Sequence, residues 1–263
     1  MNIVLYPQPK INIGLRVLAR RDDGYHDIET LFYPVDSYTD ILEIIEADSV
    51  SMNYFGTVYE LPGGDMEKEL CVKAYRLLQK EFDLPPVGIY LCKNIPVGAG
   101  MGGGSSDAAW TLRGLNDLFC LGLSMEQLAS YASQLGSDCP FFIHGIPMLG
   151  RGRGEILTPC CPDSVAGLKE RYHIKIVAPG IHVSTAGAYA SLTPDSSGKG
   201  LEKLLELPVE QWRERVINDF EKTVFARHPE IARIKQSLYD EGAVYASMSG
   251  SGSAVYGIFR NSL

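Results

Sequence analysis

The sequence predicts an α+β fold with two lobes, and three observations support this prediction. The chain has 263 residues, which is enough for one large domain or for two smaller ones. Segments with the alternation of strands are mixed with segments of helical spacing, and no long repeat or low-complexity tract interrupts them. Glycine, proline and cysteine punctuate residues 150–170, so we predict one domain over 1–155 and another over 156–263.

The first predicted elements are the two strands of a hairpin. Residues 10–17 alternate, with apolar side chains on one face of a strand and with Lys10 and Asn12 on the other face. An Asp-Gly pair at residues 23–24 is a hairpin signal, and a second strand is expected over residues 27–35.

Helices and strands are then mixed along the rest of the chain. Ser124 and Gln127 have the spacing of a capping box, and Gly136 is placed to end the helix that they begin. The remaining elements are expected as strands within 40–55, 88–96 and 173–180, as helices over 66–84, 108–118 and 201–216, and as two strands around a glycine turn over 243–260.

The composition argues against several classes of protein. A formal net charge of −8 argues against a nucleic-acid partner, which would require a basic excess or stripe. The six cysteines form no C-x-x-C pair and have no nearby histidines, so neither a zinc site nor a disulfide framework is expected. We find no secretory signal and no apolar stretch long enough for a membrane, and therefore expect a cytoplasmic protein without a membrane partner. The sequence does not indicate an oligomeric state.

A glycine-rich run, PVGAGMGGGSS at residues 96–106, lies between a predicted strand and a predicted helix. It lacks the lysine of a Walker A loop, and its match to the G-x-G-x-x-G fingerprint lacks the second strand ending in an acidic residue. A glycine turn that leads into a helix N-terminus offers unpaired N–H groups and a positive dipole end to phosphate. Ser105 and Ser106 could add hydroxyl groups for phosphate or magnesium; the alternative is a tight turn with one serine as an ordinary N-cap.

Three segments resemble motifs of the GHMP kinases, the superfamily of galactokinase, homoserine kinase, mevalonate kinase and phosphomevalonate kinase. PVGAGMGGGSSDAA resembles their second motif, and SMSGSGSAVYGIF at residues 247–259 resembles their third. PKINIGLRVLARRDDGYHDIETLF, with QLGSDCPFF further along, is similar to the members that phosphorylate a methylerythritol linked to cytidine diphosphate. The resemblance spans Pro9 to Phe259 and implies a two-lobed GHMP-kinase-like fold with the active site in the cleft between the lobes.

The resemblance implies that the γ-phosphate of ATP, with Mg²⁺, is transferred to the tertiary 2-hydroxyl group of this small-molecule substrate, in the non-mevalonate pathway to isoprenoid precursors. Asp138 is the candidate base, in a constrained turn between a helix stop and a Pro-Phe-Phe segment; an isolated aspartate there would be interpreted as a turn or helix-end carboxylate. Lys10 is the candidate for orienting Asp138 and the hydroxyl group and for stabilising the developing charge. Whether Asp138 removes the proton or only aligns the hydroxyl group is left open.

The resemblance also implies a pocket for cytosine. Tyr25 is the predicted stacking platform, His26 the predicted reader of the base edge, and Tyr189 the predicted second aromatic ring. For Phe32 and Tyr189 the alternative is plain core packing. The predicted substrate-binding residues are Asn12, Tyr25, His26, Phe32 and Tyr189.

The nucleotide is expected on the two glycine motifs. The metal ligands are left open, with Ser105 as a possible one, and Asp107 is expected to interact with the helix dipole instead of binding magnesium. Arg151 and Arg153 could meet phosphates, or they could belong to a solvated loop. The predicted nucleotide-binding residues are Pro96, Val97, Gly98, Ala99, Gly100, Met101, Gly102, Gly103, Gly104, Ser105, Ser106, Gly250, Ser251 and Gly252.

Two other functions stay open at this point. One is a GHMP kinase for homoserine or a mevalonate-like alcohol, against which the DGYH segment argues because those kinases have no cytosine to stack. The other is a non-catalytic nucleotide-binding module, against which the presence of Lys10, Asp138 and all the glycines argues.

Overall fold

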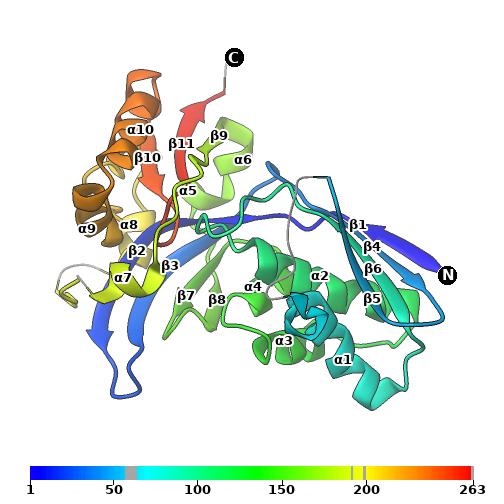
Figure 1. Cartoon of the computed structure of the whole chain (residues 1–263). Coiled ribbons are helices and arrows are strands. Elements are labelled where there is room, and N and C mark those ends of the chain that lie inside the picture. Colours follow the sequence, from blue (N-terminus) through cyan, green and yellow to red (C-terminus); the bar gives the residue numbers. More distant parts are fainter. Residues whose placement is uncertain (57–63, 191, 198–199, 262–263) are drawn as a thin grey trace. The chain divides into compact units, whose positions relative to one another are not determined.

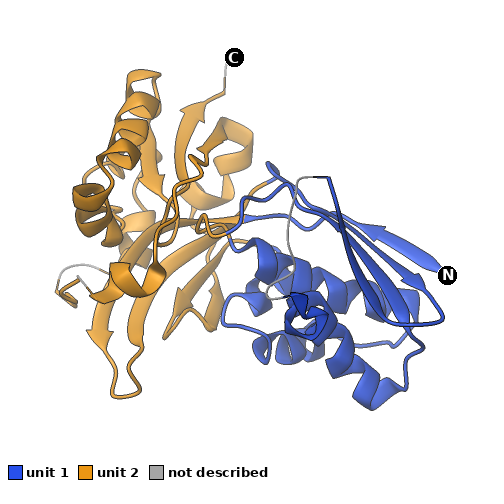
Figure 2. Cartoon of the chain, in the orientation of Figure 1, with its two compact units in different colours: residues 1–9, 36–97, 102–145 blue, residues 10–35, 98–101, 146–263 orange. Residues whose placement is uncertain are grey.

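The computed structural model describes residues 1–56, 64–190, 192–197 and 200–261. The chain forms two compact units, and each is assembled from several stretches of sequence (Figure 2). The glycine-rich run is divided between the units, and the predicted domain boundary near residue 155 falls inside unit 2 and stays a prediction. Unit 1 comprises residues 1–9, 36–97 and 102–145, and unit 2 comprises residues 10–35, 98–101 and 146–263.

Unit 1 is built on a four-stranded sheet in the order β1-β4-β6-β5 (Figure 1). Strand β5 runs parallel to β6, and the other pairs are antiparallel. The strand expected within 40–55 is divided into β4 and β5, which lie on either side of β6. The strands are β1 Asn2–Leu5, β4 Ile41–Glu46, β5 Ser51–Phe55 and β6 Val87–Cys92.

Helices cover the sheet in the described part of unit 1, where α2 packs on α1, on α4 and against strands β1 and β4. Gly114 lets α2 approach the sheet closely, because a Cβ there would collide with Leu5 and lie 3.0 Å from Ile44 Cδ1. The predicted capping box is confirmed at Ser124 and Gln127, although its helix ends at Ser133 rather than at Gly136. The helices are α1 Leu70–Phe82, preceded by a short 3₁₀ helix Met66–Lys68, α2 Gly103–Leu118, α3 Met125–Ser133 and α4 Cys139–His144.

Unit 2 contains the predicted hairpin, whose strands begin an antiparallel sheet in the order β2-β3-β7-β8. The alternation expected along residues 10–17 is interrupted at Gly14, where φ is +65° and the pairing register shifts. Both faces of this part of β2 are buried, so Lys10 and Asn12 are as enclosed as Ile11 and Ile13. The strands are β2 Lys10–Arg20, β3 His26–Pro34, β7 Met148–Arg151 and β8 Ile156–Pro159.

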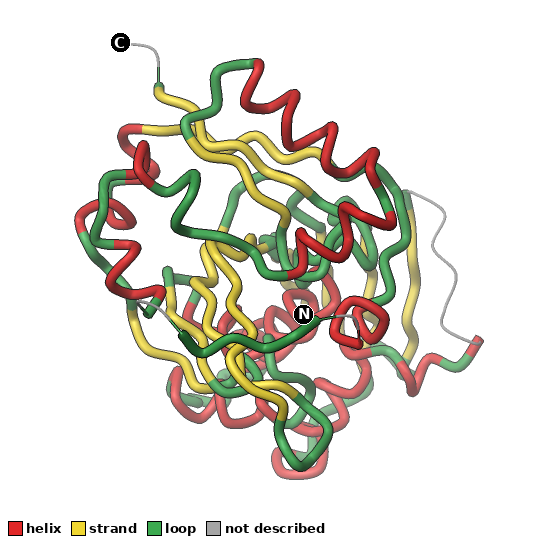
Figure 3. Tube along the Cα trace, turned by 90° about the vertical axis from the view of Figure 1, so that its left-hand side faces the viewer, coloured by secondary structure: helices red, strands yellow, loops and turns green. Residues whose placement is uncertain are grey.

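A second antiparallel sheet of unit 2 has the order β10-β11-β9. Helix α10 packs on β10 and β11, as Figure 3 shows near the strand that leads to the C-terminus. The predicted glycine turn between two strands is confirmed there. The strands are β9 Tyr172–Val177, β10 Tyr245–Met248 and β11 Val255–Arg260.

The helix predicted over residues 201–216 is wrong. The structure has a five-residue helix, α8, that ends at Leu205, and a short 3₁₀ helix from Val209 to Gln211. Pro208 lies between them; it has no N–H to donate, and it disfavours helical geometry at Leu207. The helices of unit 2 are α5 Asp163–Ala166, α6 Leu168–Arg171, α7 Thr185–Ala190, α8 Leu201–Leu205, α9 Phe220–Arg227 and α10 Pro229–Asp240.

In the part of the chain that the structure describes, no helix has the length and apolar character needed to cross a bilayer.

Candidate active site

Within unit 2, the structure packs residues 98–101 of the first predicted glycine motif against the second motif. Gly100 has a φ of +80°, and a Cβ on it would collide with the carbonyl oxygen of Ser249. The Ser249 hydroxyl donates to the Gly100 carbonyl at 2.9 Å, and the Ala254 N–H donates to the Ala99 carbonyl at 3.1 Å. Residues 98–101 are therefore fixed on the turn after β10 by backbone packing that only glycine permits at position 100.

The turn of the third motif is held by a residue that sequence reasoning did not single out. Asn218 Nδ2 donates to the carbonyl oxygens of Met248 and Gly250, each at 2.8 Å, and Asn218 is buried. The predicted residues Ser251 and Gly252 follow in the same turn, and Ser251 Oγ lies 2.9 Å from Thr185 Oγ1. Asn218 is about 30 residues before the glycine turn in the sequence, so no local pattern indicates this contact.

Lys10 and Asn12 contact each other, as their shared strand face predicts. Lys10 Nζ donates to Asn12 Oδ1 at 2.6 Å and to the Gly100 carbonyl at 3.2 Å, and only 4% of the lysine is exposed. The ammonium group also lies 5.2 Å from the centre of the Phe32 ring. Asn12 Nδ2 donates to Thr30 Oγ1 at 3.0 Å, which fixes the amide. A buried positive charge therefore lies directly against the glycine motif.

The N-terminus of α2, in unit 1, carries the second half of the glycine run. Its N-cap is Gly102, with a φ of +70° and no side-chain cap, and its first turn holds no acidic side chain. This arrangement leaves the first N–H groups of a 16-residue helix, with the positive end of its dipole, for an anion. Of the two predicted serines, Ser106 is buried and its hydroxyl donates to the Gln8 carbonyl at 2.6 Å, whereas Ser105 is partly exposed.

A buried lysine bridge behind this helix start was not predicted from the sequence. Lys93 Nζ donates to the Asp40 carboxylate and, at 2.6 Å, to Asp107 Oδ2. Asp40 also accepts the N–H of Ile95 at 2.7 Å. Burial raises the pKa of Asp107, whose Oδ1 has no hydrogen-bond partner among the described residues. Asp107 thus ties the start of α2 to the chain after β6, rather than serving only as a dipole partner.

Asp138 occupies the N-cap position of α4, also in unit 1, but its carboxylate makes no capping hydrogen bond. The side chain is partly exposed and accepts from Ser137 Oγ at 3.4 Å, while the helix that follows is buried from Cys139 to Ile143. Burial raises the pKa of the Cys139 thiol to about 11, against a hydrogen bond with Ser105 that lowers it. Cys139, the residue after Asp138, therefore contacts Ser105 of the glycine run. Helix capping does not explain why an aspartate stands at position 138.

The predicted aromatic residues of unit 2 fall into two groups. Tyr25 lies at the hairpin turn with 56% of its surface exposed. Next to it in sequence, His26 stacks on Tyr189 of α7 with ring centres 4.7 Å apart and planes at 19°. Tyr189 in turn packs edge-on against Phe220 at 4.8 Å. Phe32 is buried beneath Lys10, so the structure associates it with the lysine rather than with the other rings.

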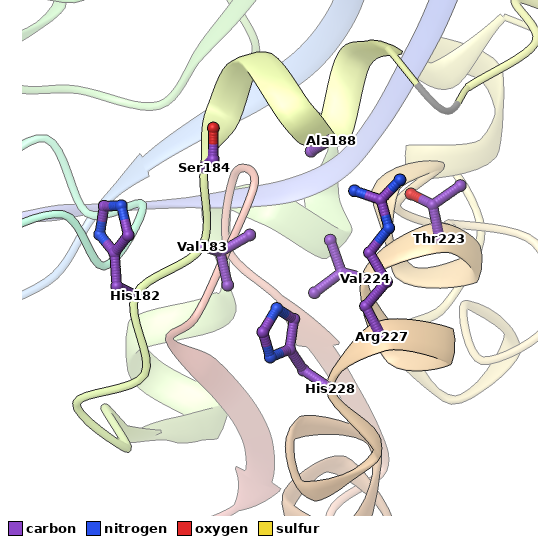
Figure 4. Close-up of a pocket in the computed structure, with 8 residues that line it drawn as sticks. All are labelled: His182, Val183, Ser184, Ala188, Thr223, Val224, Arg227 and His228. Atoms are coloured by element: carbon purple, nitrogen blue, oxygen red, sulfur yellow. The ribbon is translucent and has the colours of Figure 1, made fainter.

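A cavity of about 210 Å³ lies between α7 and α9, and none of the predicted site residues lines it. Figure 4 shows Val183 and Val224 facing each other, with the His228 ring below them and Ala188 of α7 above. The lining residues are His182, Val183, Ser184, Ala188, Thr223, Val224, Arg227 and His228.

The described residues contain no group of three or more histidine, cysteine, aspartate or glutamate side chains that could hold a metal ion. The oxygen ligands that unit 1 offers are the hydroxyl of the partly exposed Ser105 in the glycine run and the carboxylate of the partly exposed Asp138 at the start of α4, whereas the α2 N–H groups can meet only the phosphates. Mg²⁺ commonly binds through one or two protein oxygens together with substrate phosphates, so this donor set fits a nucleotide-bound magnesium ion.

Comparison with known proteins gives consistent matches along the chain. The GHMP kinases N terminal domain matches residues 69–146, and the GHMP kinases C terminal domain matches residues 197–262. A protein of Azobacteroides pseudotrichonymphae is 47% identical over 98% of this chain and 94% of its own length, and one of Bacteroides thetaiotaomicron is 48% identical over 98% and 92%. Both carry the name 4-diphosphocytidyl-2-C-methyl-D-erythritol kinase.

Solved structures agree with these matches. A crystal structure of 4-(cytidine 5'-diphospho)-2C-methyl-D-erythritol kinase is 32% identical, with a TM-score of 0.80 over 97% of this chain and 90% of that one. The mevalonate kinase of Methanococcus jannaschii has a TM-score of 0.72 at 13% identity over 98% of this chain and 91% of that one, a likeness that concerns the fold alone.

Proposed function

The chain belongs to the 4-diphosphocytidyl-2-C-methyl-D-erythritol kinases, a branch of the GHMP kinase family, and we propose that it transfers the γ-phosphate of ATP to the 2-hydroxyl group of 4-(cytidine 5'-diphospho)-2-C-methyl-D-erythritol. The family that the sequence motifs predict is thereby confirmed. The reaction would yield the 2-phosphate and ADP, in the non-mevalonate pathway to isoprenoid precursors. The observation that carries the proposal is the junction of the two glycine motifs, with the Lys10 ammonium group on the Gly100 carbonyl.

The nucleotide phosphates are assigned to the glycine run and to the start of α2. Gly98 and Gly100 turn the chain with positive φ angles, and the uncapped α2 N-terminus supplies N–H groups and a positive dipole end. We assign the phosphates and Mg²⁺ to the hydroxyl of the partly exposed Ser105 rather than to that of Ser106, which is buried and donates to the Gln8 carbonyl. A bound magnesium ion neutralises charge on the phosphates during phosphoryl transfer.

Asp138 and Lys10 are assigned to the acceptor hydroxyl group. A new bond forms between the γ-phosphorus and the substrate 2-oxygen while the bond to the β-phosphate oxygen breaks, and the hydroxyl proton must leave. Asp138, which is not used as a helix cap, would accept or align that proton. Lys10 would stabilise the developing negative charge, because Asn12 and the Gly100 carbonyl hold its ammonium group in place.

The cytidine end is assigned to the hairpin turn and α7. Tyr25 presents an exposed ring on which a base can stack, and Tyr189 supplies a second ring. The His26 imidazole, which is stacked on Tyr189, carries nitrogen atoms that can donate to or accept from a cytosine edge.

The predicted cytoplasmic location of the protein stays a prediction.

Release of ADP from ATP and Mg²⁺ tests this proposal. We expect purified protein to release ADP much faster when the cytidine-linked substrate is added than without it, and not to respond to homoserine or mevalonate. If one of those two alcohols stimulates ADP release and the cytidine-linked substrate does not, the chain phosphorylates a different acceptor from the one proposed.

A further inference from the structure

The segment GRGRGE at residues 150–155 forms a compact turn against the hairpin that carries Tyr25. Gly152 and Gly154 have φ angles of +67° and +111°, and the Gly154 N–H donates to the Arg151 carbonyl at 3.0 Å. The Gly152 carbonyl accepts the N–H of Ile28 at 2.7 Å, which ties the turn to β3. The turn therefore has a fixed place beside the start of that strand, two residues from His26.

The two arginines of this segment have different partners. Arg151 pairs with the buried Glu29 at 3.4 Å and with Glu202 at 2.9 Å, so it serves the packing of unit 2. Arg153 instead places its guanidinium carbon 4.9 Å from the centre of the Tyr25 ring. Arg153 therefore does more than extend into solvent from a loop, which was the alternative considered from the sequence, because it contacts an aromatic ring.

Arg153 is itself held in position. Its backbone N–H donates to Glu155 Oε2 at 2.5 Å, and its Nε lies 3.7 Å from Glu155 Oε1. On the other side of the contact, the Tyr25 N–H donates to Asp23 Oδ1 at 3.0 Å. That hydrogen bond is the largest influence lowering the pKa of Asp23, and the charge of Arg153 adds to it. The cation and the ring are thus each anchored by their own turn.

We propose that Arg153 is a positioning residue for the nucleobase platform, covering one face of the Tyr25 ring so that cytosine stacks on the other. An exposed aromatic side chain loses rotamer freedom when a ligand orders it, and a contact that orders it beforehand reduces that loss. A guanidinium group over a ring is an attractive contact of this kind. The inference rests on the proposed function, since it takes Tyr25 as the cytosine platform.

The test is a double-mutant cycle on the dissociation constant of the cytidine-linked substrate, measured by calorimetry without ATP. Arg153→Ala is expected to raise that constant about two- to fivefold, the range of an exposed cation–π contact, and Arg153→Lys to raise it less. In a Tyr25→Leu background, Arg153→Ala should have no further effect. In steady-state assays the KM for this substrate should rise, while kcat and the KM for ATP stay unchanged.

The matched control is Arg213→Ala, because Arg213 lies 4.1 Å from the centre of the Tyr239 ring and makes the same type of pair elsewhere in unit 2. It should leave substrate binding unchanged. An unchanged constant in Arg153→Ala overturns the inference. The inference is also overturned if Arg153→Ala raises the dissociation constant equally in the wild-type and Tyr25→Leu backgrounds, because Arg153 would then contact the substrate itself. Wild-type protein that neither binds nor turns over the substrate would instead refute the proposed function, and the role of Arg153 with it.

Discussion

The region proposed to bind the nucleotide and the region proposed to bind the cytidine end of the substrate are built in different ways. At the glycine motifs the candidate binding groups belong to the main chain. Gly100 packs on the Ser249 carbonyl, and α2 begins without a side-chain cap, which leaves its first N–H groups for a ligand. At the cytidine region the candidate groups are side chains, namely Tyr25, His26 and Tyr189, and Tyr25 is largely exposed. A backbone cradle tolerates little substitution, whereas a side-chain platform can be altered one contact at a time.

The largest effect is expected at the residue assigned to the acceptor hydroxyl group, Asp138, which belongs to neither region. Asp138→Asn should lower kcat by roughly 10²–10⁴-fold, because the amide cannot take a proton, and should leave nucleotide binding unchanged. Asp163→Asn is the control, since Asp163 is also an aspartate at the start of a short helix. Steady-state rates compare the two variants. Turnover near that of wild type in Asp138→Asn would remove Asp138 from the chemistry.

Two neighbouring glycines test whether the nucleotide region depends on close backbone packing. Gly98 and Gly100 both have positive φ, but a Cβ on Gly98 would meet open space, whereas one on Gly100 would collide with Ser249. Gly98→Ala should lower the free energy of unfolding by about 1–2 kcal/mol through backbone strain alone. Gly100→Ala should lower it by about 2–5 kcal/mol, because steric overlap adds to the strain. Urea denaturation measures both, and equal losses would contradict the packing argument.

The exposed ring of Tyr25 tests the proposed cytidine region, again by comparing two variants. Tyr25→Leu should raise the KM for the cytidine-linked substrate roughly 5–150-fold, the range of about 1–3 kcal/mol for stacking of one base on an aromatic side chain. The KM for ATP should not change. Tyr6→Leu is the control, because Tyr6 is 57% exposed, close to the 56% of Tyr25, and belongs to unit 1. A rise of similar size in both variants would show a general surface effect instead of a platform.

The smallest effects separate the two adjacent serines. Ser105→Ala should raise the KM for ATP by about tenfold, because it removes a hydroxyl group placed to meet charged phosphate or Mg²⁺. Ser106→Ala should leave that KM unchanged and lower the free energy of unfolding by about 1 kcal/mol, since it removes only the hydrogen bond to Gln8. The reverse assignment of the two phenotypes would exclude Ser105 from the nucleotide region.

The sequence predicted the parts of the site that depend on local geometry. The hairpin, the capping box at Ser124 and the glycine turn after β10 follow from short-range patterns, and all three are confirmed. The shared face of Lys10 and Asn12 also follows from strand periodicity. The glycine run predicted a phosphate cradle because few other uses require so much bare backbone.

The parts that could not be predicted depend on contacts between distant segments. Lys93 meets an aspartate 53 residues before it and another 14 residues after it, and no local pattern encodes that bridge. Asn218 contacts the glycine turn, which lies about 30 residues further along the chain. Arg153 meets Tyr25 only because the β7–β8 turn packs against the hairpin. The helix expected over 201–216 shows the converse error, where apolar spacing outweighed a proline in the prediction.

The most direct measurement is a matrix of steady-state rates in which ATP and the cytidine-linked substrate are varied together for wild type, Gly98→Ala and Tyr25→Leu. The account predicts that wild-type ADP release requires the cytidine-linked substrate, that Tyr25→Leu raises only the KM for that substrate, and that Gly98→Ala raises only the KM for ATP. ADP release that is indifferent to the cytidine-linked substrate, or variants that each raise both constants equally, would contradict it.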